Sequence, residues 1–218
     1  MKFMLEVEAY SILEGNGAPL PKYCFAKTIK EAQKAADEIG YPVVMKIVSE
    51  DILHKSDIGA VKVGLKNAED VKCAYNAIME SANRAVPNGR HRGVLITEMI
   101  SGGVETIIGL GKDPEFGRYI MFGMGGIFVE VFKDVSFRMI PLSLKDARDL
   151  INEVEGSLLL KGYRGDSKKD IEALIRLLMT CSNISESHPD IKEMDLNPVI
   201  VNEDGAFVLD ARIGRDNS

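Results

Sequence analysis

Cysteine is scarce in this chain of 218 residues, and the spacing of the few that occur excludes the usual cysteine-based sites. Cys24, Cys73 and Cys181 are widely separated and form no CxxC or CxH pattern. An odd, scattered set is typical of buried thiols in a reducing compartment, rather than of disulfides or a zinc site. The sequence therefore predicts neither a disulfide framework nor a zinc centre.

The chain also lacks a long hydrophobic run and a cluster of basic residues. Its longest charge-free stretch, residues 119–129, is too short to span a bilayer and contains three glycines. The first residues show no hydrophobic segment of a signal peptide, so we expect a cytoplasmic protein without membrane association. A net charge of −6 with no lysine or arginine run argues against nucleic-acid binding, although a cleft for a polyphosphate can be locally basic.

Hydrophobic periodicity and turn signals predict an α+β protein with two lobes. Residues 1–20 read as an N-terminal helix and a linker that is extended at its prolines. Residues 21–100 read as a first lobe in the order helix, strand, strand, helix, strand. Ser101-Gly102-Gly103 is the expected boundary, and residues 101–218 form the second lobe. No regular βαβ alternation is present, which weakens a dinucleotide-binding interpretation.

Capping and turn residues mark the ends of the expected helices and strands. In the first lobe we expect a helix opened by Thr28 and ended by Gly40, strands at 41–48, 60–65 and 93–100, and a helix over 70–85 capped by Asn67. In the second we expect strands at 104–110, 118–124, 127–133 and 137–141 and a helix that Ser143 caps and that reaches residue 155. We also expect a helix capped at residues 167–170 and a hairpin of 198–201 with 206–211.

Two features of the first lobe suggest phosphate chemistry. Lys46 interrupts an apolar strand, where an unpaired ammonium would cost several kcal/mol, so it forms a salt bridge, extends its charge to solvent or faces a phosphate. His54, Lys55 and Ser56 precede Gly59 between two strands, where backbone amides can approach an anion. A loop histidine is often only solvated, but histidine is also one of the few side chains that accept a phosphoryl group.

Carboxylate and amide groups provide the remaining candidates. Glu98 ends one strand and Glu105 begins the next across the glycine hinge; they could receive a ribose hydroxyl or be ordinary edge charges. Asn197 and Asp210 fall on two adjacent antiparallel strands, with Pro198 fixing the backbone after the amide. Oxygen ligands of this kind suit Mg²⁺, which commonly uses few protein ligands plus nucleotide phosphates. The alternative is that Asn-Pro is simply a turn.

Seven ordered segments resemble one family, the ATP-grasp subunit of acyl-CoA synthetases (ADP-forming), whose archaeal forms carry it as a separate β chain. The segments are VVMKIV (43–48), ILHKSDIG (52–59), TEMISGGVE (97–105), FGMGGIFVE (122–130), LLKGYRG (159–165), DLNP (195–198) and LDAR (209–212). The resemblance runs from about residue 13 to residue 213, and the nucleotide lobe of succinyl-CoA synthetase is similar more distantly.

The resemblance implies an ATP-grasp fold in which nucleotide binds between two α+β lobes. It implies nucleotide contacts for Lys46, Glu98, Ile100, Glu105 and the Gly59 loop, and a Mg²⁺ site at Asn197 and Asp210 with Asp195 nearby. His54 matches the histidine of a mobile loop that carries a phosphoryl group. Ala60 departs from the family, which usually has a second glycine there, so this loop is expected to be slightly stiffer.

The implied activity is that of an acid-thiol ligase: acyl-CoA, ADP and phosphate give a carboxylic acid, ATP and CoA. A CoA-binding α subunit, expected in an α2β2 heterotetramer, makes an acyl phosphate, and one of its histidines passes the phosphoryl group to His54 and on to Mg-ADP. The chain alone is expected to be inactive, and the acyl group is chosen by the partner. Two rivals are an ATP-grasp carboxylate–amine ligase, which needs no relay histidine, and a noncatalytic nucleotide-sensing module. Lys27, Lys133, Arg138 and Arg164 receive no role.

Overall fold

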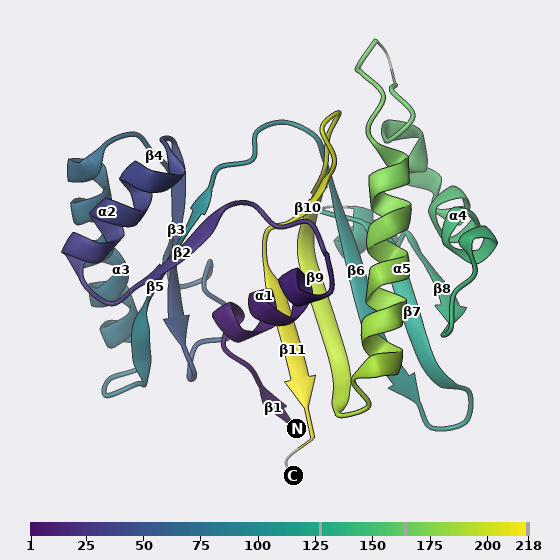
Figure 1. Cartoon of the computed structure of the whole chain (residues 1–218), viewed down its shortest axis with the longest axis horizontal. Helices are drawn as coiled ribbons and strands as arrows, with labels where there is room; N and C mark the ends of the chain where they lie inside the picture. The colour runs from purple at the N-terminus through teal and green to yellow at the C-terminus, as the bar shows by residue number, and fades with distance from the viewer. Residues whose placement is uncertain (127, 164, 217–218) are drawn as a thin grey trace. The chain divides into compact units, whose positions relative to one another are not determined.

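The computed structural model describes residues 1–126, 128–163 and 165–216, and the chain divides into two compact units (Figure 1). The first, here called the central unit, is Pro21–Ile100. The second, the terminal unit, combines Met1–Leu20 with Ser101–Ser218. The first 20 residues thus pack with the C-terminal half of the chain, across the whole length of the sequence.

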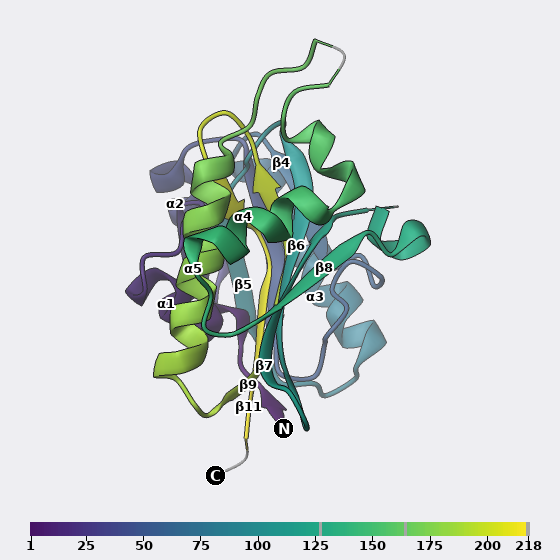
Figure 2. The ribbon, with the colours of Figure 1, turned by 90° about the vertical axis from the view of Figure 1, so that its right-hand side faces the viewer.

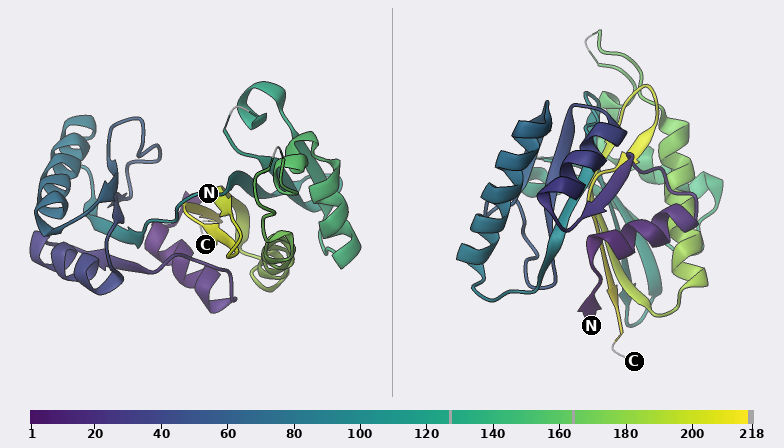
Figure 3. Two further views of the ribbon diagram at one scale, coloured as in Figure 1. Left: turned by 90° about the horizontal axis from the view of Figure 1, so that it is seen from above. Right: turned by 60° about the vertical axis from the view of Figure 1, so that its left-hand side comes forward.

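The central unit is a four-stranded antiparallel sheet with two helices. Its elements are β2 (Tyr23–Ala26), α2 (Ile29–Ile39), β3 (Val43–Ser49), β4 (Val61–Leu65), α3 (Ala68–Ala85) and β5 (His91–Glu98). The strand order is β2-β5-β3-β4, with every neighbouring pair antiparallel. Both helices lie on one face of this sheet (Figure 3).

Side-chain caps begin both helices at the expected residues. The Thr28 hydroxyl accepts a hydrogen bond from the Glu31 N–H at 3.2 Å. The Asn67 side chain accepts hydrogen bonds from the N–H groups of Glu69 and Asp70, at 3.0 and 2.9 Å. These contacts satisfy donors that the first turn of a helix leaves without partners. The predicted starts of α2 and α3 are therefore confirmed.

The core of the central unit is formed by small residues of the helices and branched residues of the strands. Buried alanines of α2 and α3 pack on alternate residues of β3, namely Val43, Met45 and Ile47. Because side chains alternate across a strand, Lys46 belongs to the opposite face of the sheet. The packing that builds this core thus also determines the direction of the lysine.

The terminal unit is a larger antiparallel sheet with helices on one face. Its elements are β1 (Lys2–Phe3), α1 (Glu6–Gly15), β6 (Val104–Asp113), β7 (Gly117–Met124), the π-helix η1 (Phe128–Phe132), β8 (Val135–Met139), α4 (Leu144–Glu153), the 3-10 helix η2 (Glu155–Leu159), α5 (Ile171–Ser187), β9 (Ile191–Val201), β10 (Ala206–Val208) and β11 (Ala211–Arg215). The strand order is β1-β11-β9-β6-β7-β8, and β10 also pairs with β9.

Helices α1, α4 and α5 pack against one face of this sheet, and α1 and α5 lie on the same side of β9 and β11 in Figure 2. The Arg118 guanidinium of β7 donates to the Ser185 carbonyl of α5 at 2.5 Å, and the Ser136 hydroxyl of β8 donates to the Leu150 carbonyl of α4 at 2.7 Å. The alternate residues of the strands form what we call the open face. Among the described residues, no helix has the length and apolar character needed to cross a membrane.

The predicted strand at 127–133 is wrong where the structure describes it, since Phe128–Phe132 form the π-helix η1; Ile127 lies outside the described residues. The run of apolar residues suggested a strand, but the backbone leaves the strand conformation on both sides of it. Gly126 and Lys133 have φ angles of 60° and 52°, in the left-handed region. The helix predicted to reach residue 155 ends at Glu153 and is followed by η2.

Strand β9 is longer than predicted, and two short strands were not predicted. β9 begins at Ile191 rather than at Pro198, and β1 and β2 have only two and four residues. An asparagine followed by proline in the middle of β9 was read as a strand boundary. The structure instead accommodates it by an irregular register between β9 and β6.

Gly93→Ala is expected to destabilise the protein by about 2 kcal/mol or more, because it introduces both strain and overlap. Gly93 has a φ angle of 145°, and an added Cβ would lie 2.3 Å from the Ala26 carbonyl oxygen. The control is Gly15→Ala in the last turn of α1, where nothing lies within 4 Å of the added methyl group. Urea denaturation followed by circular dichroism measures both variants. Equal midpoints for the two would contradict the prediction.

Candidate functional site

Lys46 lies in the middle of β3 and is almost fully buried, with 5% of its surface exposed. Its register neighbours are Leu95 in β5 and Val61 in β4, so the ammonium leaves from an apolar part of the sheet. A charge at such a position requires an acceptor or an anion to compensate for lost hydration. The predicted position of Lys46 in an apolar strand is confirmed.

His54 is exposed on the segment that joins β3 to β4. Buried residues fix both ends of this segment, Ile52 on one side and Ala60 on the other. The Ala60 N–H donates to the Lys55 carbonyl at 2.9 Å, and the Gly59 N–H donates to the Ser56 carbonyl at 3.0 Å. These two bonds form a tight turn that presents the histidine side chain to solvent.

Gly59 has a φ angle of 68°, which a residue with a Cβ adopts only with strain. Its amide is used within the turn, so the contribution of Gly59 in this conformation is the shape of the loop. Ala60, where a second glycine was expected from the resemblance, is fully buried in the core of the central unit. Its methyl group therefore contributes to packing at the end of the loop.

Glu98 and Ile100 lie at the C-terminal end of the central unit. The Glu98 N–H donates to the Lys22 carbonyl at 2.8 Å, and the Lys22 N–H donates to the Glu98 carboxylate at 3.4 Å. The Met99 N–H donates to the Pro42 carbonyl at 3.3 Å. The backbone from Glu98 to Ile100 is thus held against two other segments, and both side chains are partly exposed.

Asn197 and Asp210 lie directly opposite each other in the terminal unit. The Asn197 N–H donates to the Asp210 carbonyl at 3.1 Å, and the Leu209 N–H donates to the Pro198 carbonyl at 3.0 Å. Opposed residues of an antiparallel pair project to the same face. The juxtaposition predicted from the sequence is confirmed, and the amide and carboxylate oxygens suit a hard cation such as Mg²⁺.

Asp195 and Arg212 extend this polar group by one step of the same ladder. The register places Arg212 opposite Asp195, and Gly109 of β6 on its other side. Burial raises the pKa of the Asp195 carboxyl, while the Arg212 charge opposes this shift and Asp210 adds to it. Arg212 had no predicted role. The signal was available, because pairing Asn197 with Asp210 pairs residues 195 and 212 as well.

The donor set at Asn197 and Asp210 is small. Among residues 1–126, 128–163 and 165–216, no three or more histidine, cysteine, aspartate or glutamate side chains are grouped to hold a metal ion. An amide and a carboxylate leave most of an octahedral shell to other oxygens, which is the usual situation for Mg²⁺ bound together with phosphates. The residues present therefore fit a nucleotide-linked magnesium ion.

Glu105 is exposed near the start of β6, next to a glycine turn. The Gly125 N–H donates to the Glu105 carbonyl at 2.7 Å, and an added Cβ at Gly125 would lie 2.8 Å from the Glu105 Cβ. Only a glycine permits this close approach of the two backbones. The FGMGG segment therefore fixes the position of Glu105, a link that the sequence analysis did not make.

A hollow of about 430 Å³ lies on the open face of the terminal unit. Its lining includes Gly109, Gly111, Tyr119, Phe137 and Asp195. The ring of Tyr119 lies over Gly111, where an added Cβ would be 2.5 Å from the tyrosine hydroxyl, and it packs edge-on against Phe137. The aromatic pair and the glycines thus line the hollow next to the Asp195 carboxylate.

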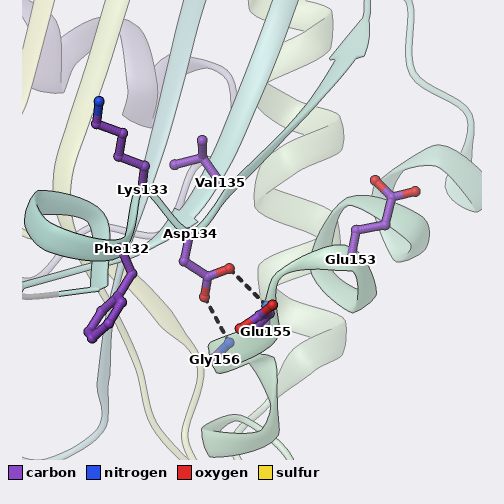
Figure 4. A pocket seen from close by; sticks show the side chains of 7 residues that line it. All are labelled: Phe132, Lys133, Asp134, Val135, Glu153, Glu155 and Gly156. Carbon is purple, nitrogen blue, oxygen red and sulfur yellow. Dashed lines mark hydrogen bonds between the residues drawn. The ribbon is translucent and has the colours of Figure 1, made fainter.

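Four basic residues had no predicted role, and the structure describes three of them. Arg138 forms a bidentate ion pair with Glu153, and Lys133 lines a cavity of about 570 Å³ (Figure 4). In this cavity the Asp134 carboxylate accepts hydrogen bonds from the N–H groups of Glu155 and Gly156, both at 2.8 Å, and so caps η2 (Figure 4). Lys27 is exposed, and Arg164 lies outside the described residues.

Comparison with known proteins identifies the fold. The ATP-grasp domain family matches residues 1–214. The chain is 48% identical over 213 residues to the acetate–CoA ligase [ADP-forming] II subunit beta of Pyrococcus furiosus, covering 96% of this chain and 90% of that protein. The predicted ATP-grasp fold is therefore confirmed.

Solved structures agree. An acetyl-coenzyme A synthetase 1 of Ca. Korarchaeum cryptofilum, in complex with coenzyme A, Ca-AMPCP and HgCl+, superposes with a TM-score of 0.96 at 47% identity, covering 99% of this chain and 94% of that chain. In a second structure of that enzyme, with coenzyme A and Mg-AMPPCP, the phosphohistidine segment points towards the nucleotide binding site. Its TM-score is 0.85 at 44% identity, with 99% and 93% coverage.

Arg212→Gln is expected to raise the pKa of the Asp195 carboxyl further, because it removes a positive charge that opposes the effect of burial. An NMR titration of the side-chain carboxyl carbons measures this pKa directly. Arg215→Gln is the control, since Arg215 in the same strand pairs with Asp190 instead. An Asp195 titration midpoint that falls or stays constant in Arg212→Gln would contradict the electrostatic account.

Proposed function

Because this chain belongs to the ATP-grasp family of ADP-forming acyl-CoA synthetase β subunits, we propose that it is the nucleotide-binding subunit of such an enzyme. The reaction is acyl-CoA, ADP and phosphate to carboxylic acid, ATP and CoA, that of an acid-thiol ligase. The observation that carries the proposal is His54, exposed on a turn whose two ends are buried. This is the arrangement needed by a group that receives a phosphoryl group at one site and delivers it at another.

The nucleotide contacts are assigned to single residues, as the family resemblance implies. Lys46, Glu98 and Ile100 of the central unit, together with the Gly59 loop, contact the phosphates and the base. Glu105 of the terminal unit contacts the ribose side. A lysine on an apolar strand suits a phosphate, because a buried ammonium gains most from an anion that replaces its hydration.

Asn197 and Asp210 are assigned to Mg²⁺, which would neutralise charge on the phosphates when bound with the nucleotide. The support is their opposed position on adjacent strands and their oxygen chemistry. The acidic surroundings of Asp195 favour a cation at this place as well. These residues hold the nucleotide in position, and positioning is the main protein contribution to a loose phosphoryl-transfer transition state.

The relay consists of three phosphoryl transfers, each of which forms one new bond to phosphorus. In the partner, acyl-CoA and phosphate give an acyl phosphate and CoA, and a partner histidine takes the phosphoryl group and releases the carboxylic acid. An imidazole nitrogen of His54 then attacks the phosphorus, and the bond to the partner's histidine breaks. Finally, an oxygen of the ADP β-phosphate attacks, the P–N bond of His54 breaks and ATP forms. The imidazole of His54 is exposed, so a phosphoryl donor can reach its nitrogen atoms.

The proposal includes a CoA-binding α subunit as partner, which supplies the acyl phosphate chemistry. The Pyrococcus furiosus relative is named as a beta subunit, which implies such a partner for that protein. We place the two chains in an α2β2 heterotetramer, with no role for nucleic acid or membrane. The three free cysteines and the use of ADP and coenzyme A support a cytoplasmic location.

His54→Gln is expected to abolish phosphohistidine in this chain and to lower acyl-CoA-dependent ATP synthesis by at least about a hundredfold, because the reaction passes through the imidazole. The measurement uses the complex of this chain with its CoA-binding partner, acyl-CoA, labelled phosphate and ADP. The control is His188→Gln, at the C-terminal end of α5. We expect strong labelling in the complex and slow or absent labelling of this chain alone with Mg-ATP. Label that persists on this chain in His54→Gln would eliminate the relay role.

Asp210→Asn is expected to weaken the affinity for Mg-ATP by about tenfold or more, or roughly 1.4 kcal/mol, because one anionic metal ligand becomes neutral. Isothermal titration calorimetry on the isolated chain compares binding with and without Mg²⁺, since ATP without metal should bind the variant and the wild type alike. Asp204→Asn, in the turn before β10, is the matched control. Equal Mg²⁺ dependence in all three proteins would remove Asp210 from the metal site.

A further inference from the structure

A cluster of charged residues fixes the N-terminal base of the His54 loop. It comprises Glu50 and Asp51, directly after β3, and Arg90 and Arg92, at the start of β5. The Asp51 carboxylate accepts a hydrogen bond from the Arg90 N–H at 2.6 Å and two from its guanidinium, at 2.8 and 3.3 Å. Both the backbone and the side chain of Arg90 therefore hold one carboxylate.

Glu50 links the two arginines. Its carboxylate lies 2.6 Å from a guanidinium nitrogen of Arg90 and accepts two hydrogen bonds from Arg92. Its backbone N–H donates to the Arg90 carbonyl at 3.3 Å. Two acids and two arginines form a neutral network in which Arg90 contacts both carboxylates. We call these four residues the base clamp.

The neighbours of the base clamp extend the fixed region. Ser49 Oγ and His91 Nδ1 lie 3.0 Å apart, and the Asp51 N–H donates to the same hydroxyl at 3.2 Å. His91 is thus a partly buried residue at the start of β5. Ile52, which follows Asp51 in the sequence, is 7% exposed and belongs to the hydrophobic core. The backbone is held up to two residues before His54.

The acidic half of the base clamp differs from an ordinary surface ion pair. The side chains of Glu50 and Asp51 are 16% and 27% exposed, whereas the Arg84–Glu80 pair on α3 is 72% exposed at both residues. Hydrogen bonds from Arg90 lower the pKa of Asp51 to about 2, so the carboxylate stays ionised at any working pH. Isolated pairs on a surface contribute little, but a network with bidentate geometry restrains its residues.

We propose that Arg90, through Glu50 and Asp51, is a positioning residue for phosphoryl transfer by His54. This inference rests on the proposed relay function. The base clamp keeps the start of the loop stationary, so that movement is confined to residues 53–57, which include the exposed His54. A loop with a fixed base returns its histidine to the same place with little loss of conformational entropy. A loop with a free base distributes His54 over many positions, and a displacement of about 1 Å can cost a hundredfold in rate.

The test compares Arg90→Gln with Arg84→Gln in the complex of this chain with its CoA-binding partner. Arg90→Gln should lower kcat for acyl-CoA-dependent ATP synthesis by about 10- to 100-fold, with KM for ADP within about twofold of wild type. Arg84→Gln removes an exposed arginine–glutamate pair of the same unit and should leave both constants unchanged. Arg90→Lys keeps the positive charge but loses the planar guanidinium that contacts both Glu50 and Asp51. Its kcat should therefore lie between those of wild type and Arg90→Gln.

A second readout separates positioning from folding. Phosphoramidate is a small phosphoryl donor that needs no positioned partner, and it should modify His54 in Arg90→Gln at the wild-type rate, as intact mass shows. If Arg90→Gln does not fold, Asp51→Asn removes the strongest contact of the base clamp, and the same fall in kcat is expected. A kcat within about twofold of wild type in these variants would overturn the inference. Full activity of His54→Gln would instead overturn the proposed function.

Discussion

The antiparallel register between β9 and the segment that ends in β11 determines most of the chemistry of the terminal unit. It sets Leu196 opposite Ala211 and Met194 opposite Ile213, and all four side chains are buried. Because side chains alternate with a period of two, the residues between them must face the other way. A slip by one residue would place charged side chains in the core and apolar ones in solvent.

The same register therefore both builds the core and assembles the polar group. Asn197 and Asp210 meet on the open face because their neighbours are required on the helix-covered face. Asp195 and Arg212 follow one step further along the ladder. The packing energy of the buried neighbours holds these two donors, which we assign to a cation, in place. The irregular register between β9 and β6 occurs beside Asn197, where the chain adjusts to the proline.

Alternation explains the central unit in the same way. Val43, Met45 and Ile47 pack against the helices, so alternation directs Lys46 to the opposite face of the sheet. The two faces of β3 thus differ: one packs in the core of the central unit, and the other carries the lysine that we assign to a phosphate.

Much of this arrangement was accessible from the sequence, and the exceptions have physical causes. The caps at Thr28 and Asn67 and the pairing of Asn197 with Asp210 depend on residues close in sequence or joined by one short turn. The π-helix η1 was missed because its composition favours a strand, while left-handed backbone at Gly126 and Lys133 prevents one. Strand β2 was missed because it has four residues and is stabilised by pairing with β5, some 70 residues away in sequence.

The base clamp is the clearest example of a feature that local sequence patterns do not predict. Glu50 and Asp51 are separated from Arg90 by about 40 residues, so no local pattern connects them. In sequence they resemble ordinary surface charges at the end of a strand. Only the pairing of β3 with β5 brings them together, next to the loop that presents His54. A relay histidine must meet two sites and so cannot be buried or tightly bonded itself. The order that its reaction needs must therefore come from residues on either side of it, and these are the residues that local sequence reasoning finds last.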